Sequence, residues 1–353
     1  MIFIFSTILV LGILVFVHEL GHFLVAKSVG IRVEKFSLGF PPKLVSKKIG
    51  ETEYILSWIP LGGYVKMAGE DPEEEKEERK PWDFMAKSVW QRAKVIFAGP
   101  AMNFILAIIL FWGILFIGGK QKDYPEKSVI GVVEKGGPAE KGGLMPGDEI
   151  ISINDKPVFN FSQMAEIIYS QVEKPILVKW RRQGKEFSAT IITRKEKTVN
   201  IKGETEFIGK IGIGPFYEKI KVGFFQAFWE GFLAAIFLLV GTIKFLIMLV
   251  SGQASVKLLG GPVFIAQTAG ETAKMGASSL FSFIGILSVN LSLLNILPIP
   301  ILDGGHILFL IIEKLKGKPL SLKQRTFMQQ VGLAFLVALI LLVTYNDILR
   351  WAK

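Results

Sequence analysis

The sequence predicts a multi-pass α-helical membrane protein, with about four transmembrane helices and a soluble α/β domain inserted between two of them. Half of the 353 residues are apolar and only 20% are charged, against roughly 25% charged in an average soluble domain. The mean hydropathy of +0.44 reflects long apolar runs, several of them sufficient to cross a hydrocarbon core of roughly 30 Å. Such clustered hydrophobicity excludes a disordered chain and argues against a wholly soluble protein.

Four apolar segments are expected to span the membrane. The first, residues 1–26, carries no charge over its first 17 residues, and it lacks the basic start and small-residue cleavage site of a signal peptide. The others are residues 95–118, 278–303 and 331–350. Residues 224–250 are also apolar, but they contain Glu230 and Lys244. We therefore expect an amphipathic or re-entrant region, 219–277, that is associated with the membrane.

Two polar stretches separate these segments. Residues 27–94 begin with a strand-like alternation over Ile31–Met67 and continue into an acidic run, Glu70–Glu78, which we expect to be a solvated loop. Residues 120–215 combine short strands and Gly/Pro turns with a helical stretch near Ser162–Gln171, the pattern of a compact α/β domain.

The composition excludes several kinds of site. There is no Cys, so disulfides, thiolate metal sites and Cys nucleophiles are excluded. Any imidazole ligand must come from the three histidines, which are His18, His22 and His306. The net charge of +10 comes with no nucleic-acid-binding motif, so we assign it to the cytoplasmic flanks of membrane segments and expect no nucleic-acid partner.

The motif His18-Glu19-Leu20-Gly21-His22 predicts a catalytic metal site in the first apolar segment. Positions i and i+4 share one face of a helix, so both imidazoles can reach one ion, and Glu19 beside them can accept a proton from water. Two histidines used only in packing would be the alternative. That alternative is weak, because polar groups are costly to bury within a membrane and are usually functional there.

A third ligand is needed, because catalytic zinc sites use three protein ligands and one open position. Asp303 is the first candidate, since it follows two prolines that interrupt a helix at membrane depth. The alternative role for Asp303 is a helix N-cap. His306 is the second candidate ligand, and its alternative role is that of an outer or interfacial residue.

The motif HELGH, together with Asn295–His306 (NILPIPILDGGH), resembles the site-2 protease family of intramembrane zinc metalloproteases, with the bacterial regulator-of-sigma-E protease group as the closest match. Residues 36–67 resemble the membrane re-entrant β-loop of that group, and Trp90–Phe104 resembles the entry to its second span. The Gly/Pro-rich motifs between Gly136 and Asn154 resemble a bacterial PDZ domain, of which this chain has room for one.

The resemblance implies roles for individual residues. It implies Zn²⁺ held by His18, His22 and Asp303, with Glu19 as the catalytic base. It also implies substrate-binding roles for Asn290, Asn295, Pro298 and Pro300. Hydrogen bonding between membrane helices is an equal alternative for Asn290 and Asn295, and it is our expectation for Asn103.

A single metal site constrains the topology. For the ligands to meet, the spans that carry His22 and Asp303 must run in the same direction, so residues 224–250 cannot form a lone extra crossing. Lysines and arginines follow Asp303 and precede the second span, which predicts a cytoplasmic metal end and an extracytoplasmic PDZ domain. We expect the binding edge of that domain near Val129–Val133.

Together, the motif and the resemblance imply a zinc metalloendopeptidase of the inner (cytoplasmic) membrane that acts in regulated intramembrane proteolysis. The resemblance implies substrates that are pre-cleaved single-span membrane proteins, such as anti-sigma factors and remnant signal peptides. The implied partners are these substrates, the lipid bilayer and a peptide or C-terminus at the PDZ domain. A membrane-anchored PDZ scaffold and a zinc transporter or sensor are the competing classes, and the intact HExxH motif argues against the scaffold.

Overall fold

A computed structural model describes residues 2–70, 79–123 and 128–351. The predicted acidic loop falls largely on residues 71–78, which lie outside the described residues. The chain forms two compact units. The membrane unit contains residues 1–118, 223–247 and 259–353. The second unit contains residues 119–222 and 248–258, and we call it the PDZ unit after the domain that the sequence predicts there.

Among the described residues, five helices are long and apolar enough to cross a membrane, which makes the chain a multi-pass helical membrane protein. They are α1 (Ile2–Ser28), α2 (Val89–Gly118), α5 (Phe224–Val250), α7 (Ala277–Ile296) and α9 (Leu322–Trp351). Two shorter helices, α6 (Pro262–Met275) and α8 (Asp303–Lys316), and the 3₁₀ turn η1 (Phe84–Ala86) complete the helices of this unit.

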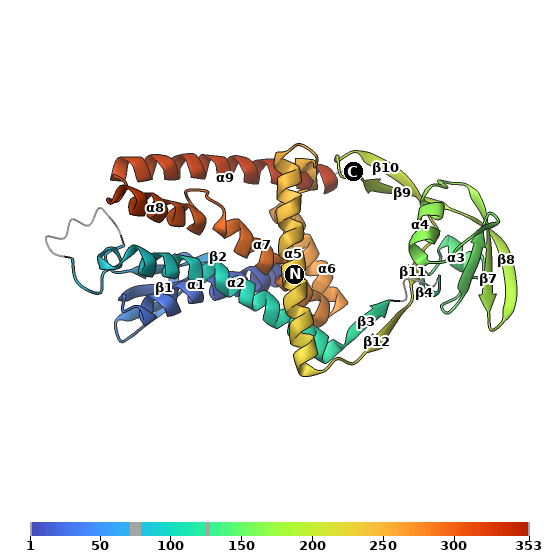
Figure 1. Cartoon of the computed structure of the whole chain (residues 1–353), viewed down its shortest axis with the longest axis horizontal. Coiled ribbons are helices and arrows are strands. Elements are labelled where there is room, and N and C mark those ends of the chain that lie inside the picture. The colour runs from blue at the N-terminus through green and yellow to red at the C-terminus, as the bar shows by residue number, and fades with distance from the viewer. Residues whose placement is uncertain (1, 71–78, 124–127, 352–353) are drawn as a thin grey trace. The chain divides into compact units, whose positions relative to one another are not determined.

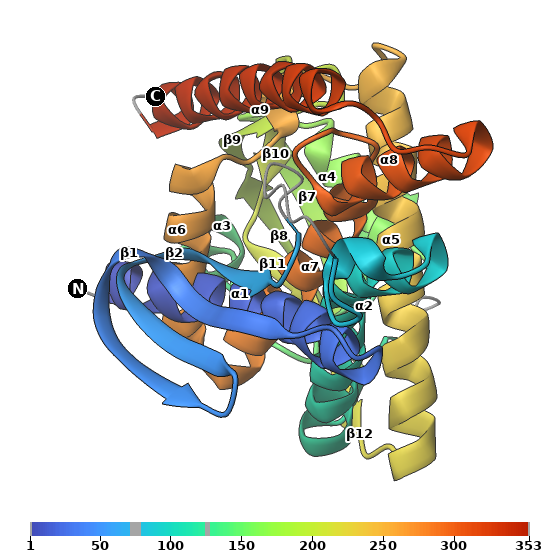
Figure 2. The same cartoon turned by 90° about the vertical axis from the view of Figure 1, so that its left-hand side faces the viewer.

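Helix α5 is the apolar helix that was not among the four expected spans. It is continuous over 27 residues, and in both views it runs crosswise to α1 and α9 (Figures 1 and 2). A helix that lies along the membrane surface would have this orientation relative to spanning helices. The placement of α5 along the membrane surface stays a prediction, and the labelling experiment described below would test it.

Helix α7 ends earlier than the predicted segment 278–303. Its last residue is Ile296, and residues 297–302 are not helical. Pro298 and Pro300 explain the break, because each lacks the backbone N–H that would continue the helix. Residues 304–330, for which we predict a cytoplasmic loop, are helical over their first part, because α8 runs from Asp303 to Lys316.

The helices of the membrane unit approach one another closely. A Cβ atom at Gly21 of α1 would lie 2.3 Å from the Ala98 carbonyl oxygen of α2, so only glycine permits this crossing. The core beside it contains Val10, Leu14, Ala269, Phe283 and Ile284. The amino end of α6 is fixed by Asp347 of α9, whose carboxylate accepts hydrogen bonds from the amides of Gly261 (3.0 Å) and Phe264 (2.9 Å).

Strands β1 (Val33–Ile49) and β2 (Thr52–Met67) are long, bend back on themselves and pair with each other. Residues 35–38 of β1 pair on one side with residues 53–56 and on the other with residues 63–66. The segment Gly63–Lys66 therefore lies at the edge of this sheet, and it also borders the cavity described below.

The PDZ unit has a core of its own. Strands β5 (Glu149–Ile153), β6 (Lys156–Pro157), β7 (Pro175–Arg182) and β8 (Lys185–Ile192) form an antiparallel sheet in the order β6-β5-β7-β8. Helix α4 (Phe161–Tyr169) begins at Asn160, whose side chain accepts a hydrogen bond from the Gln163 amide. Buried side chains from the sheet and α4 include Ile150, Ile153, Met164, Ile168, Val178 and Trp180.

Short strands and helices complete this unit. They are β3 (Lys120–Asp123), β4 (Ile130–Val133), α3 (Pro138–Lys141), β9 (Arg194–Val199), β10 (Thr205–Lys210), β11 (Ile213–Pro215), β12 (Tyr217–Ile220) and the 3₁₀ turn η2 (Val256–Leu258). Strand β9 pairs with β10, β11 with β4, and β12 with β3.

The expected peptide-binding edge near Val129–Val133 is wrong. Strand β4 is paired with β11 on one side, and Val129 bridges Glu149 on the other. The hollow beside α4 is lined instead by Lys210–Ile213. The reason is non-local, because β11 returns from about eighty residues later in the chain and adds itself to β4.

Candidate metal centre

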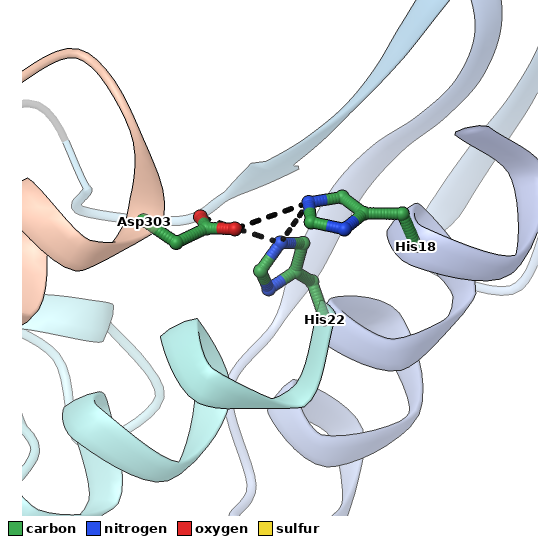
Figure 3. A group of neighbouring side chains, drawn as sticks. All are labelled: His18, His22 and Asp303. Atoms are coloured by element: carbon green, nitrogen blue, oxygen red, sulfur yellow. Dashed lines mark hydrogen bonds and ion pairs between the residues drawn. The ribbon is translucent and has the colours of Figure 1, made fainter. Parts of the chain in front are cut away.

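His18, His22 and Asp303 lie together in the membrane unit (Figure 3). Nε2 of His18 lies 3.1 Å from Oδ2 of Asp303, and Nε2 of His22 lies 3.6 Å from Oδ1 of Asp303. The two Nε2 atoms are 3.1 Å apart. Within the described residues, this is the one group of three metal-ligating side chains whose ligand atoms all lie within 4.8 Å of one another.

Asp303 reaches the two histidines from the break between α7 and α8. It is the first residue of α8, and the N-cap position belongs to Leu302. Capping therefore does not account for the direction of its carboxylate. The two glycines that follow let this turn pack against backbone, because a Cβ at Gly304 would lie 2.1 Å from the Ile296 carbonyl oxygen and one at Gly305 would lie 2.3 Å from that of Ile299.

Helix α2 supports both imidazoles. Nδ1 of His22 lies 2.8 Å from the Val95 carbonyl oxygen, and Nδ1 of His18 lies 3.3 Å from the Asn103 amide. Gly99 lies between these contacts, and a Cβ there would come within 2.3 Å of Nε2 of His22 and 2.8 Å of Cε1 of His18. Val95, Gly99 and Asn103 recur every four residues, so they form one face of α2.

The hydrogen bond of His22 fixes where its proton lies. A carbonyl oxygen only accepts, so Nδ1 of His22 carries the hydrogen and its Nε2 presents a lone pair to the neighbouring Nε2 and carboxylate. With the lone pair of His18 Nε2 directed at the same point, these three electron-rich atoms would repel unless a cation lay among them. Two ligands about 2.05 Å from one ion at the tetrahedral angle are about 3.3 Å apart. The two Nε2 atoms are 3.1 Å apart, and the shortest distances from them to Asp303 are 3.1 and 3.6 Å, to its two different oxygens. The donor set therefore fits a tetrahedral divalent ion.

The cluster faces a cavity of about 600 Å³ within the membrane unit. Glu19 lines this cavity beside the histidines, together with Val65 of the sheet edge. His306 lines the same cavity but does not belong to the group of three. Burial lowers the pKa of His306, so its ring is neutral.

The remaining predicted residues are distributed around this cluster. Oδ1 of Asn290 accepts a hydrogen bond of 3.0 Å from Thr242 of α5, whereas Nδ2 of Asn295 lies 3.5 Å from Nδ1 of His18. Pro298 and Pro300 lie in the non-helical segment before Asp303. Sequence reasoning did not find the roles of Val95 and Gly99, although their spacing from Asn103 was a usable signal.

Comparisons with known proteins decide the family. A family model described as Peptidase family M50 matches residues 6–339. The chain belongs to Peptidase family M50. It is similar to the zinc metalloprotease RasP of Geobacillus kaustophilus, with 33% identity over 99% of this chain and 98% of that protein. The regulator of sigma-W protease RasP of Bacillus subtilis is 32% identical, over 97% of each chain.

A third relative of this M50 protein is the regulator of sigma-E protease RseP of Salmonella typhimurium, which is 32% identical over 97% of each chain. Among solved structures, the PDZ domain of an SdrC-like protein from Listeria monocytogenes aligns with 27% of this chain and 92% of its own, at 21% identity and a TM-score of 0.21. This M50 protein is thus a membrane-spanning member of a zinc metalloprotease family.

Proposed function

We propose that this M50 protein is an intramembrane zinc endopeptidase that hydrolyses peptide bonds in or near the transmembrane segments of pre-cleaved single-span membrane proteins. The observation that carries the proposal is the group of His18, His22 and Asp303 beside Glu19, at the end of a membrane helix. In this proposal His18, His22 and Asp303 hold Zn²⁺. Their separations and lone-pair directions support that role.

Zinc, when bound, supplies the Lewis acidity that makes water a competent nucleophile near neutral pH and polarises the scissile carbonyl. Glu19 accepts a proton from the attacking water and later gives it to the leaving amine. Glu19 borders the cavity that the three ligand side chains also line, which is where the attacking water would lie in this proposal. The chain thus supplies both the base and its position.

A helical substrate must unwind before cleavage, because its carbonyl groups are hydrogen-bonded within the helix. The sheet edge at Gly63–Lys66 borders the same cavity as Glu19, and it can hold an extended segment by strand addition. Asn295 is half-buried near His18 and offers an amide to freed backbone groups. Asn290 has the weaker claim, because its side chain already bonds Thr242.

The PDZ unit is proposed to bind an extended peptide or a C-terminus in the hollow between α4 and Lys210–Ile213. We infer that substrates include anti-sigma factors and remnant signal peptides, which agrees with two relatives being regulators of sigma-E and sigma-W. The proposed location is the inner (cytoplasmic) membrane, with the metal end towards the cytoplasm and the PDZ domain outside.

One experiment tests the protease proposal. Full-length protein in detergent is incubated with a single-span substrate that has been truncated on its outer side, and the products are followed by mass spectrometry. We expect wild-type protein to cleave, Glu19→Gln to bind zinc without cleaving, and chelator to abolish cleavage. Glu186→Gln, at an exposed position of the PDZ unit, is the matched control and should cleave normally. Wild-type cleavage by Glu19→Gln would falsify the assignment.

A second experiment tests the topology. Single cysteines at Lys219 and Lys274 are labelled with a membrane-impermeant reagent in intact and permeabilised cells, which is feasible because the chain has no native Cys. If α5 lies against the membrane without crossing it, both positions are labelled from the same side. Labelling from opposite sides would overturn the proposed placement of α5.

A further inference from the structure

Asn103 is a fully buried polar residue in the second apolar helix. Its exposed fraction is 0%, its Nδ2 lies 3.3 Å from Nδ1 of His18, and its Oδ1 has no hydrogen-bond partner among the described residues. Its backbone carbonyl accepts a hydrogen bond of 2.7 Å from Ser288 of α7. A buried amide oxygen without a partner costs about 1–3 kcal/mol, so this arrangement calls for an explanation.

The chemistry of His18 supplies one. If His18 presents the lone pair of Nε2 to an ion, its Nδ1 must carry the hydrogen and needs an acceptor. An amide nitrogen cannot accept that hydrogen. The oxygen and nitrogen of an Asn amide exchange places by a half-turn about the terminal bond, and the side chain has nearly the same shape in both settings. In the turned setting, Oδ1 of Asn103 accepts the Nδ1–H of His18.

Asn295 is the competing acceptor, because its amide lies 3.5 Å from the same nitrogen. Two differences favour Asn103. Asn103 is closer, and it is fully buried with an oxygen that has no other partner among the described residues, whereas the half-buried Asn295 can meet water or substrate. Asn103 would also mirror the Val95 carbonyl, which plays the same part for His22 from the same face of α2.

We propose that Asn103 is the positioning residue of His18, whose amide oxygen accepts the Nδ1–H and thereby orients Nε2 of His18 towards a divalent cation. This inference rests on the proposed function, since it takes His18 as a metal ligand. Asn103 touches neither substrate nor metal. Outer partners of this kind typically change metal affinity by about 10–100-fold.

The test measures zinc affinity of the full-length protein in detergent by competition with a chromophoric chelator. We expect Asn103→Leu to weaken zinc binding by about 10–100-fold, and Asn103→Asp, which keeps an acceptor oxygen, to bind zinc within a few-fold of wild type. Ser288→Ala is the matched control. It removes a buried hydrogen bond to the Asn103 backbone without touching His18, so thermal stability should fall while zinc affinity stays unchanged.

The outcomes separate this inference from the metal site itself. If His18→Ala binds zinc as tightly as wild type, the metal assignment fails. If His18→Ala loses zinc but folded Asn103→Leu binds it like wild type, only the role of Asn103 fails. Should Asn103→Leu not fold, long-range ¹H–¹⁵N spectra of the wild-type imidazoles decide, because there are only three histidines to assign. A hydrogen on Nε2 of His18 in the zinc-free protein would overturn the proposal.

Discussion

His18 and His22 reach the candidate metal centre from one helix, whereas Asp303 reaches it from nearly the other end of the chain. The histidine half is set by the four-residue spacing on α1 and by contacts of the rings with Val95, Gly99 and Asn103 of α2. The aspartate half depends on backbone packing at Gly304 and on how α8 is held. The two imidazoles are thus positioned by contacts with one face of α2, whereas the Asp303 carboxylate is positioned by the backbone turn that precedes α8.

Helix α2 connects the two halves. Arg92, near its start, is 5% exposed at the side chain and binds both carboxylate oxygens of Glu313 on α8, at 2.6 and 3.1 Å. Directly after Glu313 in the chain, Lys314 has its Nζ 4.2 Å from the centre of the Trp90 ring. The same helix thus supports the imidazoles and anchors the helix that begins with Asp303. Perturbing each half separately should therefore give different combinations of lost zinc and lost stability.

The largest effect is expected at Gly99. In Gly99→Ala, the new methyl group would occupy the space of both imidazole rings. The rings can rotate away, so we expect loss of stoichiometric zinc and of cleavage with little change in thermal unfolding. Zinc content by atomic emission and a melting curve measure the two effects. Gly113→Ala on the same helix should retain zinc, because a Cβ there would meet nothing within 4 Å among the described residues beyond its own stretch of helix. Wild-type zinc content in Gly99→Ala would contradict the described packing.

Gly304→Ala should come next. Its methyl group meets backbone carbonyls at 2.1 and 2.2 Å, so the turn itself must move and carry Asp303 with it. We expect zinc affinity to fall by at least the ~10–100-fold that loss of an outer partner causes, together with a lower melting temperature. A variant that lost stability but kept wild-type zinc affinity would mean that Asp303 is not fixed by this turn.

Breaking the Arg92–Glu313 pair should mainly affect stability. Glu313→Gln leaves a buried guanidinium without its counter-charge, which typically costs on the order of 3–5 kcal/mol. Zinc affinity should fall less than in Gly304→Ala, because Asp303 lies three turns away along α8. The double variant Arg92→Leu/Glu313→Leu should recover much of the lost stability, since it removes both charges. Failure of that recovery would show that the pair contributes more than charge compensation.

The smallest effect on zinc is expected for Asp347→Ala, far along the sequence from both halves. Losing the acceptor for the Gly261 and Phe264 amides should cost about 0.5–2 kcal/mol, as for other helix caps. Denaturant unfolding would measure this loss, and zinc competition should give the wild-type value. A drop in zinc affinity would mean that the α6–α9 contact also determines the geometry of the centre.

Much of the centre could be predicted because its signals are local. The spacing of His18 and His22 follows from helix geometry, and a carboxylate after helix-breaking prolines identified Asp303 as a partner. The supporting contacts could not be predicted in the same way. Which face of α2 meets the imidazoles depends on the close crossing at Gly21, a property of two helices together.

In the fold, too, local features could be predicted and contacts between distant segments could not. Apolar length predicted the helices, but it could not indicate that α5 runs crosswise to α1. In the PDZ unit, the expected edge at β4 was wrong because β11 pairs there. Long-range strand pairing leaves little trace in the alternation of a single strand, since alternation reports burial rather than neighbours.

The side-chain acceptor for the start of α6 lies 86 residues later in the sequence than the amide of Gly261 that it binds. During synthesis, the amides of Gly261 and Phe264 must therefore wait for Asp347, because the residue at the α6 N-cap, Gly261, has no side chain to offer. The start of α6 therefore reaches its final hydrogen bonding only once α9 is in place beside it. A chain without the Asp347 carboxylate would leave these two amides without this acceptor.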